Sequence, residues 1–505
     1  MPTRRTILQT LALTTGAALT RRLNALDLSN AQIARDPMRP QYHLQPARGW
    51  MNDPCGPIYW KGRYHMFHQY NPNAAVWGDM HWAHATSPDM VHWHREPIAL
   101  APTPGGPDQD GCFTGTAVVS DGRPTFLYTG VQKVPPDQAT LRDGNSNLRE
   151  TQCLAIGEDD ALRHWRKLPQ PVIAALPAGM EVTGFRDPSP WYDDHDKLWY
   201  MVVASGQRGI GGNVLLYKSA DLRQWKYLHP LAQGKWSGKP GANPVDTGEM
   251  WECPDFFPLG DTQGGKHVLI HSTEGKTIWR IGTLDRATML FHAESEGILD
   301  HGAYYAPKTQ LDAHGNRILW GWITETRPQA EYSAAGWAGM MSLPRRLSIA
   351  GNQLVMEPAT EVASLRTKPR MGAAVKRLPT AAQEIQLTLE PNGSAFEQSF
   401  VDNQGAAILL RAGHTGLYYG HSSGDAQLPA NTIQIGGKKI TGLAAAPLDL
   451  HIFLDHSVAE IFLNHRHAIT QRYYQRTTME PAVAITLGGL WRIAQQQAWS
   501  LKGIW

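Results

Sequence analysis

The chain has 505 residues, of which 42% are hydrophobic and 18% charged, and its formal net charge at pH 7 is +2. This length predicts two domains. The near-neutral balance, without runs of lysine or arginine, argues against nucleic acid or a membrane surface as the partner and suits an uncharged ligand such as a sugar. The many Gly (48), Pro (35) and Trp (18) residues favour turn-rich β structure over helical bundles.

The N-terminus carries two adjacent arginines, Arg4 and Arg5, before a short apolar stretch that runs to about Leu19. The stretch is too short to span a bilayer. Twin arginines in this position resemble a bacterial twin-arginine export signal. We therefore expect residues 1–34 to be an export signal and leader, and the mature protein to be periplasmic or extracellular and free of the membrane. A frayed amphipathic terminus is the alternative.

A pattern of a polar motif, an apolar run, a polar turn and a second apolar run occurs five times, starting near residues 52, 112, 186, 252 and 300. A second pattern, an acid followed by an apolar residue and then a tryptophan, interleaves with it at 89–93, 160–165 and 221–225. Repeats of this size, built from short strands, predict a β-propeller, and five units imply five blades. A two-sheet sandwich is the alternative.

The pattern changes after residue 356. We expect residues 35–356 to form the five-bladed β-propeller and residues 357–370 to form a short helical linker. Short alternating strands then resume over 384–389, 407–411, 448–454 and 458–462, and a last strand lies near 491–505. Residues 371–505 are therefore predicted to form a C-terminal β-sandwich. This region carries no constellation of acids, so we expect it to serve packing, oligomer contacts or the pocket rim.

Three acids, Asp53, Asp187 and Glu252, stand at corresponding places in three of the five units. The innermost strand of each propeller blade lines the central channel, so side chains at the starts of these strands converge. Carboxylates held close together do not share one proton affinity, because repulsion and burial raise the affinity of at least one. Retaining glycoside hydrolysis uses such a pair about 5 Å apart, one as nucleophile and one as acid/base.

The motifs around these acids, at 50–54, 185–188 and 251–254, are similar to the three signature motifs of glycoside hydrolase family 32, which contains invertases, inulinases and levanases. Further matches lie at 113–116, 337–345 and 454–462. The resemblance covers nearly the whole chain from about residue 40, in the family's order. It implies a five-bladed propeller followed by a β-sandwich, in agreement with the repeats.

The resemblance also implies roles. Asp53 is expected to attack the anomeric carbon of a β-fructofuranosyl unit, and Glu252 to protonate the leaving oxygen and then deprotonate water. Asp187 is expected to stay ionised and hold fructose hydroxyls. The residues expected to bind the substrate are Asn52, Gln69, Trp77, Phe113, Thr114 and Arg186. Packing is the alternative for Trp77 and the better expectation for Trp82.

The chain departs from the family at three places: Cys55 stands where Asn is usual, Thr114 where Ser is usual, and Asp79 where Asn is common. Cys253 is the usual neighbour of the acid/base. The four cysteines lie far apart without a C-x-x-C pair, so no structural zinc is expected, and whether Cys55 and Cys253 form a disulfide is open. The histidines between 81 and 94 fit packing better than metal binding. No cofactor is expected.

The sequence thus predicts an exported retaining β-fructofuranosidase that acts on sucrose or small fructans, as a monomer or homodimer. One alternative is a fructosyltransferase on the same scaffold. The other, from a different class, is an inactive carbohydrate-binding or sensing protein, which retention of all three acids argues against.

Overall fold

The computed structural model describes residues 28–140, 147–241, 243–260, 265–413, 428–443, 446–474 and 481–505. The expected export signal lies outside these residues. No helix of the described chain is both long and apolar enough to cross a membrane. The chain divides into two compact units, one holding 44–299 and 304–355 and the other holding 35–43, 300–303 and 356–505.

The first unit contains five sheets, one for each predicted blade. Four antiparallel strands follow one another in each of the first four sheets. These are β1 (Gly49–Trp60), β2 (Arg63–Asn71), β3 (His81–Ser87) and β4 (His94–Leu100); β5 (Cys112–Ser120), β6 (Arg123–Lys133), β7 (Leu148–Gly157) and β8 (Trp165–Lys167); β9 (Phe185–Asp193), β10 (Leu198–Gln207), β11 (Gly211–Ser219) and β12 (Lys226–Gln233); and β13 (Glu252–Leu259), β14 (Lys266–Thr273), β15 (Lys276–Asp285) and β16 (Leu290–Asp300).

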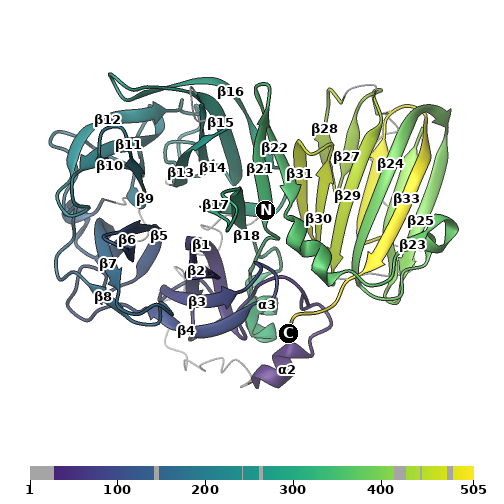
Figure 1. Cartoon of the computed structure of the whole chain (residues 1–505), viewed down its shortest axis with the longest axis horizontal. Helices are drawn as coiled ribbons and strands as arrows, with labels where there is room; N and C mark the ends of the chain where they lie inside the picture. Colours follow the sequence, from purple (N-terminus) through teal and green to yellow (C-terminus); the bar gives the residue numbers. More distant parts are fainter. Residues whose placement is uncertain are drawn as a thin grey trace, which may run out of the picture. The chain divides into compact units, whose positions relative to one another are not determined.

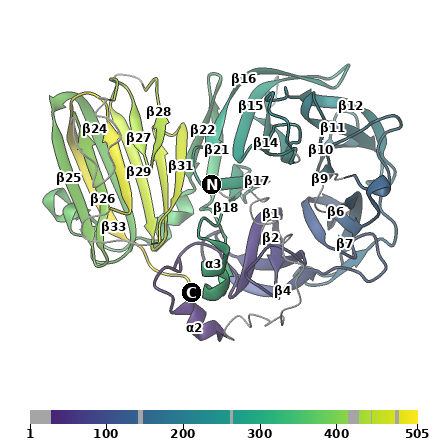
Figure 2. The same ribbon diagram turned by 180° about the vertical axis from the view of Figure 1, so that it is seen from behind.

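The fifth sheet contains β17 (Tyr304–Leu311), β18 (Arg317–Ile323), β21 (Arg345–Ala350) and β22 (Gln353–Pro358), and β20 (Met340–Met341) pairs with β18. The first strands of the five sheets form a closed ring, because β1 contacts both β5 and β17, β9 contacts both β5 and β13, and β13 contacts β17. Figures 1 and 2 show this ring from its two sides. The predicted five-bladed β-propeller is confirmed.

The ring is closed by backbone pairing between its end and its start. After α3 (Gln329–Ala335), β19 (Trp337–Ala338) pairs in parallel with β1, with Trp337 opposite Gly49. Gly49 has φ of +87°, and a Cβ there would lie 2.4 Å from the carbonyl oxygen of Asn71, so glycine is required at this close approach. This closure holds β1, which carries Asp53, between two neighbouring blades.

The turns between the third and fourth strands of the first three blades explain the acid-to-tryptophan pattern. Asp89 and Asp221 each accept backbone N–H bonds from the residues two and three positions further on, which caps the turn. The apolar residues of the pattern, Met90, Leu162 and Leu222, have φ of 65°, 56° and 63° and are buried. Each turn therefore fixes the entry to an outer strand.

The fifth repeat differs from the prediction. Asp300 does not head the innermost strand of the fifth blade, because it ends β16, and β17 begins at Tyr304. The Asp300 carboxylate accepts the backbone N–H of Thr470 at 2.9 Å and its hydroxyl at 2.7 Å, within the second unit. The polar motif that opens the fifth repeat therefore belongs to the end of β16, and its acid bonds to the edge of the sandwich.

The second unit contains two sheets, as expected for a β-sandwich. Its core is a single apolar cluster that includes Ile385, Leu450 and Ile485. One sheet has the order β23 (Arg370–Met371), β33 (Trp491–Ser500), β24 (Ala382–Ser394), β29 (Leu448–Asp455), β30 (Val458–Leu463) and β31 (His467–Arg472). The other has β25 (Phe396–Asp402), β26 (Gly405–Ala412), β32 (Val483–Leu487), β27 (Ile433–Ile435) and β28 (Lys438–Ile440).

Two segments outside the sheets bear on the predicted domain boundaries. The predicted helical linker is the 3₁₀ helix η2 (Thr360–Leu365). Residues 35–43, which the sequence analysis placed in the propeller, belong to the second unit, where the Asp455 carboxylate accepts the backbone N–H groups of Gln41, Tyr42 and His43 at 2.7–3.2 Å. These hydrogen bonds join residues more than 400 positions apart in the sequence, so no local pattern predicts them.

Candidate active site

Asp53 lies on β1 and is 1% exposed. The register between β1 and β2 shifts between Met51 and Pro54, which places a bulge at this acid. The Asp53 Oδ1 accepts a hydrogen bond from Asn52 Nδ2 at 3.0 Å, and its Oδ2 accepts one from Thr114 Oγ1 at 2.5 Å. Both carboxylate oxygens of Asp53 are therefore held.

Gln69 on β2 closes this arrangement into a ring of hydrogen bonds. Its Oε1 accepts from Asn52 Nδ2 at 2.8 Å and its Nε2 donates to Thr114 Oγ1 at 2.5 Å. Trp50 Nε1 donates to Asn52 Oδ1 at 2.8 Å and so fixes the orientation of that amide. The structure thus brings together the predicted residues Asn52, Gln69 and Thr114 around Asp53.

Asp187 on β9 has a left-handed backbone, with φ of 65°. Its N–H donates to Thr129 Oγ1 at 2.8 Å, and its Oδ2 accepts the backbone N–H of Cys253 at 2.8 Å. Cys253 and Ala306, near the starts of β13 and β17, also have positive φ, of 49° and 52°. A non-glycine residue adopts this conformation only where the surrounding structure holds it. The same distortion at the heads of three inner strands directs their side chains into the ring.

The thiol of Cys253 joins two of the acids. Its Sγ lies 3.4 Å from Asp53 Oδ2 and 3.4 Å from Asp187 Oδ2. The pKa of Asp187 is raised to about 6, because burial and the Glu252 and Asp53 carboxylates raise it by more than Arg186 and the Cys253 N–H lower it. Burial, then Asp187 and Asp53, raise the pKa of the Cys253 thiol well above its usual value. Cys253 is therefore a neutral hydrogen-bond donor between two acids.

Glu252, at the head of β13, is 1% exposed. Its Oε1 accepts from Arg186 Nε at 3.1 Å and Nη2 at 2.9 Å, and its Oε2 accepts from Tyr305 OH at 2.8 Å. Burial opposes the charge of Arg186, but Glu150, Glu252 and Asp187 raise its pKa well above the usual value. The structure thus brings the predicted acids Asp53, Asp187 and Glu252 together with Arg186.

Two residues in this network were not predicted from the sequence. Tyr305 directly precedes Ala306 in β17 as Glu252 directly precedes Cys253 in β13, and Ala306 and Cys253 share a positive φ, so a correct alignment of the fifth repeat would have indicated it. Glu150 lies on β7, the third strand of the second blade, and bonds to Arg186 Nη1 at 2.9 Å. No motif surrounds Glu150, and no sequence signal indicates it.

The predicted aromatic residues lie beside this group. Trp77 is partly buried, its ring meets the edge of Phe113 with centroids 5.8 Å apart, and both belong to a cluster with Trp50 and Cys253. The indole Nε1 of Trp77 is buried and has no hydrogen-bond partner within the described structure. Trp82 is fully buried and donates to the Phe113 carbonyl at 3.0 Å, which agrees with the predicted packing role.

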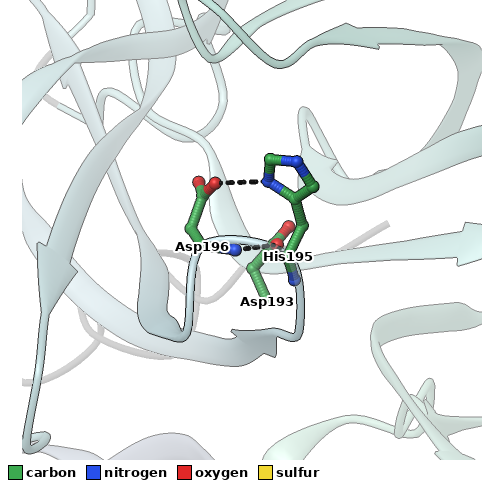
Figure 3. A group of neighbouring side chains, drawn as sticks. All are labelled: Asp193, His195 and Asp196. Carbon is green, nitrogen blue, oxygen red and sulfur yellow. Dashed lines mark hydrogen bonds and ion pairs between the residues drawn. The ribbon is translucent and has the colours of Figure 1, made fainter.

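One group of three potential metal ligands occurs among the described residues, Asp193, His195 and Asp196, at the turn after β9 (Figure 3). Asp193 already accepts two hydrogen bonds from Arg286 Nη1, at 3.0 and 3.1 Å, and the backbone N–H groups of His195 and Asp196. His195 Nδ1 lies 2.8 Å from Asp196 Oδ1. This is a capped turn with an ion pair, far along β9 from Asp187.

The cysteines are buried in the structure, whereas the histidines that the sequence analysis discussed differ in burial, with His84 buried and His92 and His94 exposed. All four cysteines are free and buried, so Cys55 and Cys253 do not form a disulfide. Cys55 Sγ donates to the Asp53 carbonyl at 3.4 Å. His84 stacks on Phe67 with ring centroids 4.3 Å apart.

The sequence matches the family model for the glycosyl hydrolases family 32 N-terminal domain over residues 43–358 and the model for the family 32 C-terminal domain over residues 366–497. Among curated proteins, the sucrose-6-phosphate hydrolase of Escherichia coli is 35% identical over 470 residues, which cover 85% of this chain and 88% of that protein.

Solved structures agree. A fructan 1-exohydrolase from Cichorium intybus in complex with 1-kestose is 26% identical, with a TM-score of 0.71 over 92% of this chain and 98% of that one. A β-fructofuranosidase from Bombyx mori in complex with sucrose is 27% identical, with a TM-score of 0.68 over 94% and 96% of the two chains.

Proposed function

The chain belongs to glycosyl hydrolase family 32, a family of glycoside hydrolases, and from that premise we propose that it is a retaining β-fructofuranosidase. It hydrolyses terminal β-fructofuranosyl linkages of sucrose or small fructans through a covalent fructosyl-enzyme intermediate. The observation that carries the proposal is the meeting of Asp53, Asp187 and Glu252, with Cys253 Sγ 3.4 Å from two of them and Arg186 on the third.

In the first step, an Asp53 carboxylate oxygen forms a bond to the anomeric carbon as the glycosidic bond breaks. Glu252 gives its proton to the leaving oxygen. The hydrogen bonds from Asn52 and Thr114 keep Asp53 in a single orientation, so little reorganisation precedes attack. Because the Asp53 and Glu252 carboxyls are both buried, neighbouring charges act on them strongly, and their proton affinities differ more than they would in water.

In the second step, the Glu252 carboxylate takes a proton from water, and the water oxygen bonds to the anomeric carbon as the bond to Asp53 breaks. Retention follows from two displacements on one carbon. Asp187 neither accepts nor donates a proton here. Its carboxylate binds fructose hydroxyls and stabilises the positive charge that develops in the ring.

The substrate-binding residues support a small neutral sugar. Trp77 offers a partly exposed ring and an unbonded indole N–H beside the acids, which suits stacking on a sugar and donation to a hydroxyl. Phe113 supports that ring from its edge. Sugar binding in the related structures, 1-kestose in one and sucrose in the other, supports the same substrate class.

The twin-arginine motif at Arg4 and Arg5 supports export to the periplasm or beyond. Curated relatives include sucrose-6-phosphate hydrolases, but an exported enzyme meets sugar outside the cytoplasm, so we propose that the substrate is unphosphorylated. Assays of the purified protein with sucrose, sucrose 6-phosphate, 1-kestose, inulin and levan test this. Higher kcat/KM for sucrose 6-phosphate than for sucrose would contradict it. Fractionation of cells expressing the full chain and an Arg4→Lys, Arg5→Lys variant tests export, which the variant should lose.

The chemistry is tested by Asp53→Asn, because the amide is not a nucleophile. We expect kcat on sucrose to fall by at least about 10⁴-fold with unchanged folding by circular dichroism. Activity comparable with the wild type would eliminate the mechanism. Measured release of free fructose against longer oligosaccharides at high sucrose separates hydrolysis from fructosyl transfer, and an inactive wild-type protein that binds sucrose would indicate a binding protein.

A further inference from the structure

Glu150 is a carboxylate that the proposed mechanism does not use, although it is 1% exposed and sits behind the active site. Its Oε1 accepts from Arg186 Nη1 at 2.9 Å. Its Oε2 accepts the backbone N–H of Phe185 at 2.6 Å and faces Thr140 Oγ1 at 3.3 Å. No hydrogen bond links it to Asp53, Asp187 or Glu252 in the described structure, so it can act on them only through Arg186 or through its charge.

Arg186 is shared between two carboxylates. One edge of its guanidinium, Nε and Nη2, donates to Glu252 Oε1, and Nη1 donates to Glu150 Oε1. Gly184 makes room for the guanidinium, because a Cβ there would lie 2.5 Å from Arg186 Nη1. With carboxylates on two of its edges, we expect this buried arginine to stay beside Glu252 when the protonation state of Glu252 changes.

This sharing addresses a conflict in the chemistry. Glu252 must hold a proton in the first step, yet a buried cation at hydrogen-bond distance favours its ionised form. Arg186 is the cation that bonds to Glu252, whereas Lys308 on β17 donates to the Pro254 carbonyl. Tyr305 on β17 donates to Glu252, and Asp187 on β9 and Cys253 on β13 interact with Glu252 electrostatically. None of these three groups is a cation, and the Asp187 carboxylate is the one among them that offsets the charge of Arg186.

We propose that Glu150 is a positioning residue that neutralises Arg186, so that Glu252 keeps its proton in the pH range where the enzyme works. The inference rests on the proposed function. With Glu150 ionised, the Arg186 charge is divided between two anions and its effect on Glu252 is weakened. Without that charge, Glu252 and Asp187 are left to offset the guanidinium, and Glu252 gives up its proton more readily.

The test is the pH profile of kcat/KM for sucrose in Glu150→Gln. Gln can still accept the Phe185 N–H, so only the charge and one bond to Arg186 are lost. We expect the alkaline limb of the profile to move to lower pH by roughly one unit. At the wild-type optimum the loss should be smaller on an activated aryl β-fructofuranoside than on sucrose, because its leaving group needs less protonation.

Two variants serve as controls. Glu150→Asp keeps the negative charge in a shorter side chain. The alkaline limb of its pH profile should therefore move by less than half as far as that of Glu150→Gln. A packing defect, by contrast, would affect both variants. Asp193 lies at the other end of the same strand, β9, where it bonds to Arg286. Asp193→Asn removes this carboxylate and should leave the alkaline limb of the pH profile unchanged.

The outcomes separate cleanly. An unmoved alkaline limb in active Glu150→Gln, or equal losses on the two substrates, overturns the proposal and assigns Glu150 a purely structural role. If Glu150→Gln does not fold, a Glu150→Asp variant whose alkaline limb moves by a full pH unit, although the charge is kept, overturns it. Failure of the proposed function itself would instead appear as an inactive wild type or as full activity in Asp53→Asn.

Discussion

The two units of this protein each bury a cluster of acids, and they neutralise them differently. In the propeller, Glu252 and Glu150 bond to one buried arginine, Arg186, and Asp53 and Asp187 each lie 3.4 Å from the Cys253 thiol. In the sandwich unit, His43 lies between two acids, with Nδ1 2.8 Å from Asp455 Oδ2 and Nε2 3.0 Å from Glu460 Oε1. All these acids are almost fully buried.

The pKa shifts show the consequence. Burial opposes the charge on His43, but the hydrogen bonds to Asp455 and Glu460 raise its pKa to about 9. Burial and neighbouring carboxylates instead raise the pKa of Asp187 to about 6. The sandwich cluster has one imidazolium for two acids, and we expect it to stabilise the fold. The propeller cluster carries excess negative charge, which costs stability and provides acids of unequal proton affinity for catalysis.

The largest effect on stability is expected from His43→Gln, which removes the imidazolium that bonds to two buried carboxylates. We expect the free energy of unfolding at pH 6 to fall by about 3–5 kcal/mol, measured by urea titration. The folded pKa of His43, about 9, lies above its usual 6.5. The contribution of the imidazolium is therefore fully present below pH 6.5 and lost as the pH rises through about 9, so the two proteins should converge there.

His164→Gln is the matched control for this prediction. His164 Nδ1 lies 2.9 Å from Asp159 Oδ2, but its side chain is 78% exposed. Its loss should cost less than about 1 kcal/mol. An equally small effect of His43→Gln would show that the sandwich cluster does not stabilise the fold.

Asp187→Asn should raise the free energy of unfolding, whereas His43→Gln should lower it. The folded pKa of Asp187, about 6, lies above its usual 3.8, so the carboxylate costs stability above pH 6 and this cost disappears as the pH falls towards 3.8. At pH 8 we expect the variant to be more stable by about 1–3 kcal/mol while losing most of its activity. The amide oxygen can still accept the Cys253 N–H.

Asp193→Asn, on the same strand, gives the contrast. Burial opposes ionisation of Asp193, but the Asp196 N–H and Arg286 lower its pKa, so its loss should destabilise the protein at pH 8. Thermal melts at pH 4.5 and pH 8 distinguish the two variants, because at pH 8 the Tm should rise for Asp187→Asn and fall for Asp193→Asn. A destabilised Asp187→Asn at pH 8 would refute the view that the propeller cluster costs stability.

The smallest effect is expected for Cys55→Ala. Cys55 stands where the family usually has Asn, and its Sγ makes one weak bond to the Asp53 carbonyl, at 3.4 Å. We expect a loss of about 1 kcal/mol in stability and a change in kcat of less than about threefold. A large fall in kcat with an unchanged KM would show instead that the thiol positions the nucleophile.

The sequence was sufficient to predict the propeller and its acids because both depend on local signals repeated along the chain. An acid before a proline, at the start of an apolar run, marks an inner strand at Asp53 and at Asp187. The fifth repeat was misaligned because Asp300 imitates that signal at the end of β16.

The rest depends on contacts between distant residues. Asp455 and Glu460 lie in a recognised motif, yet their partner His43 is more than 400 residues away, so the expectation that the sandwich lacks a group of acids was wrong. Glu150 is likewise indicated only by the placement of Arg186 in space.

The measurement that tests the account most directly is intact-mass and peptide analysis of Glu252→Gln after brief exposure to an activated aryl β-fructofuranoside. Without the acid/base, the activated substrate can still form the intermediate, whereas its hydrolysis is slowed. We predict one added fructosyl unit, bound to Asp53 of the propeller cluster. No adduct in a folded, turning-over variant, or an adduct on another residue, would contradict the account.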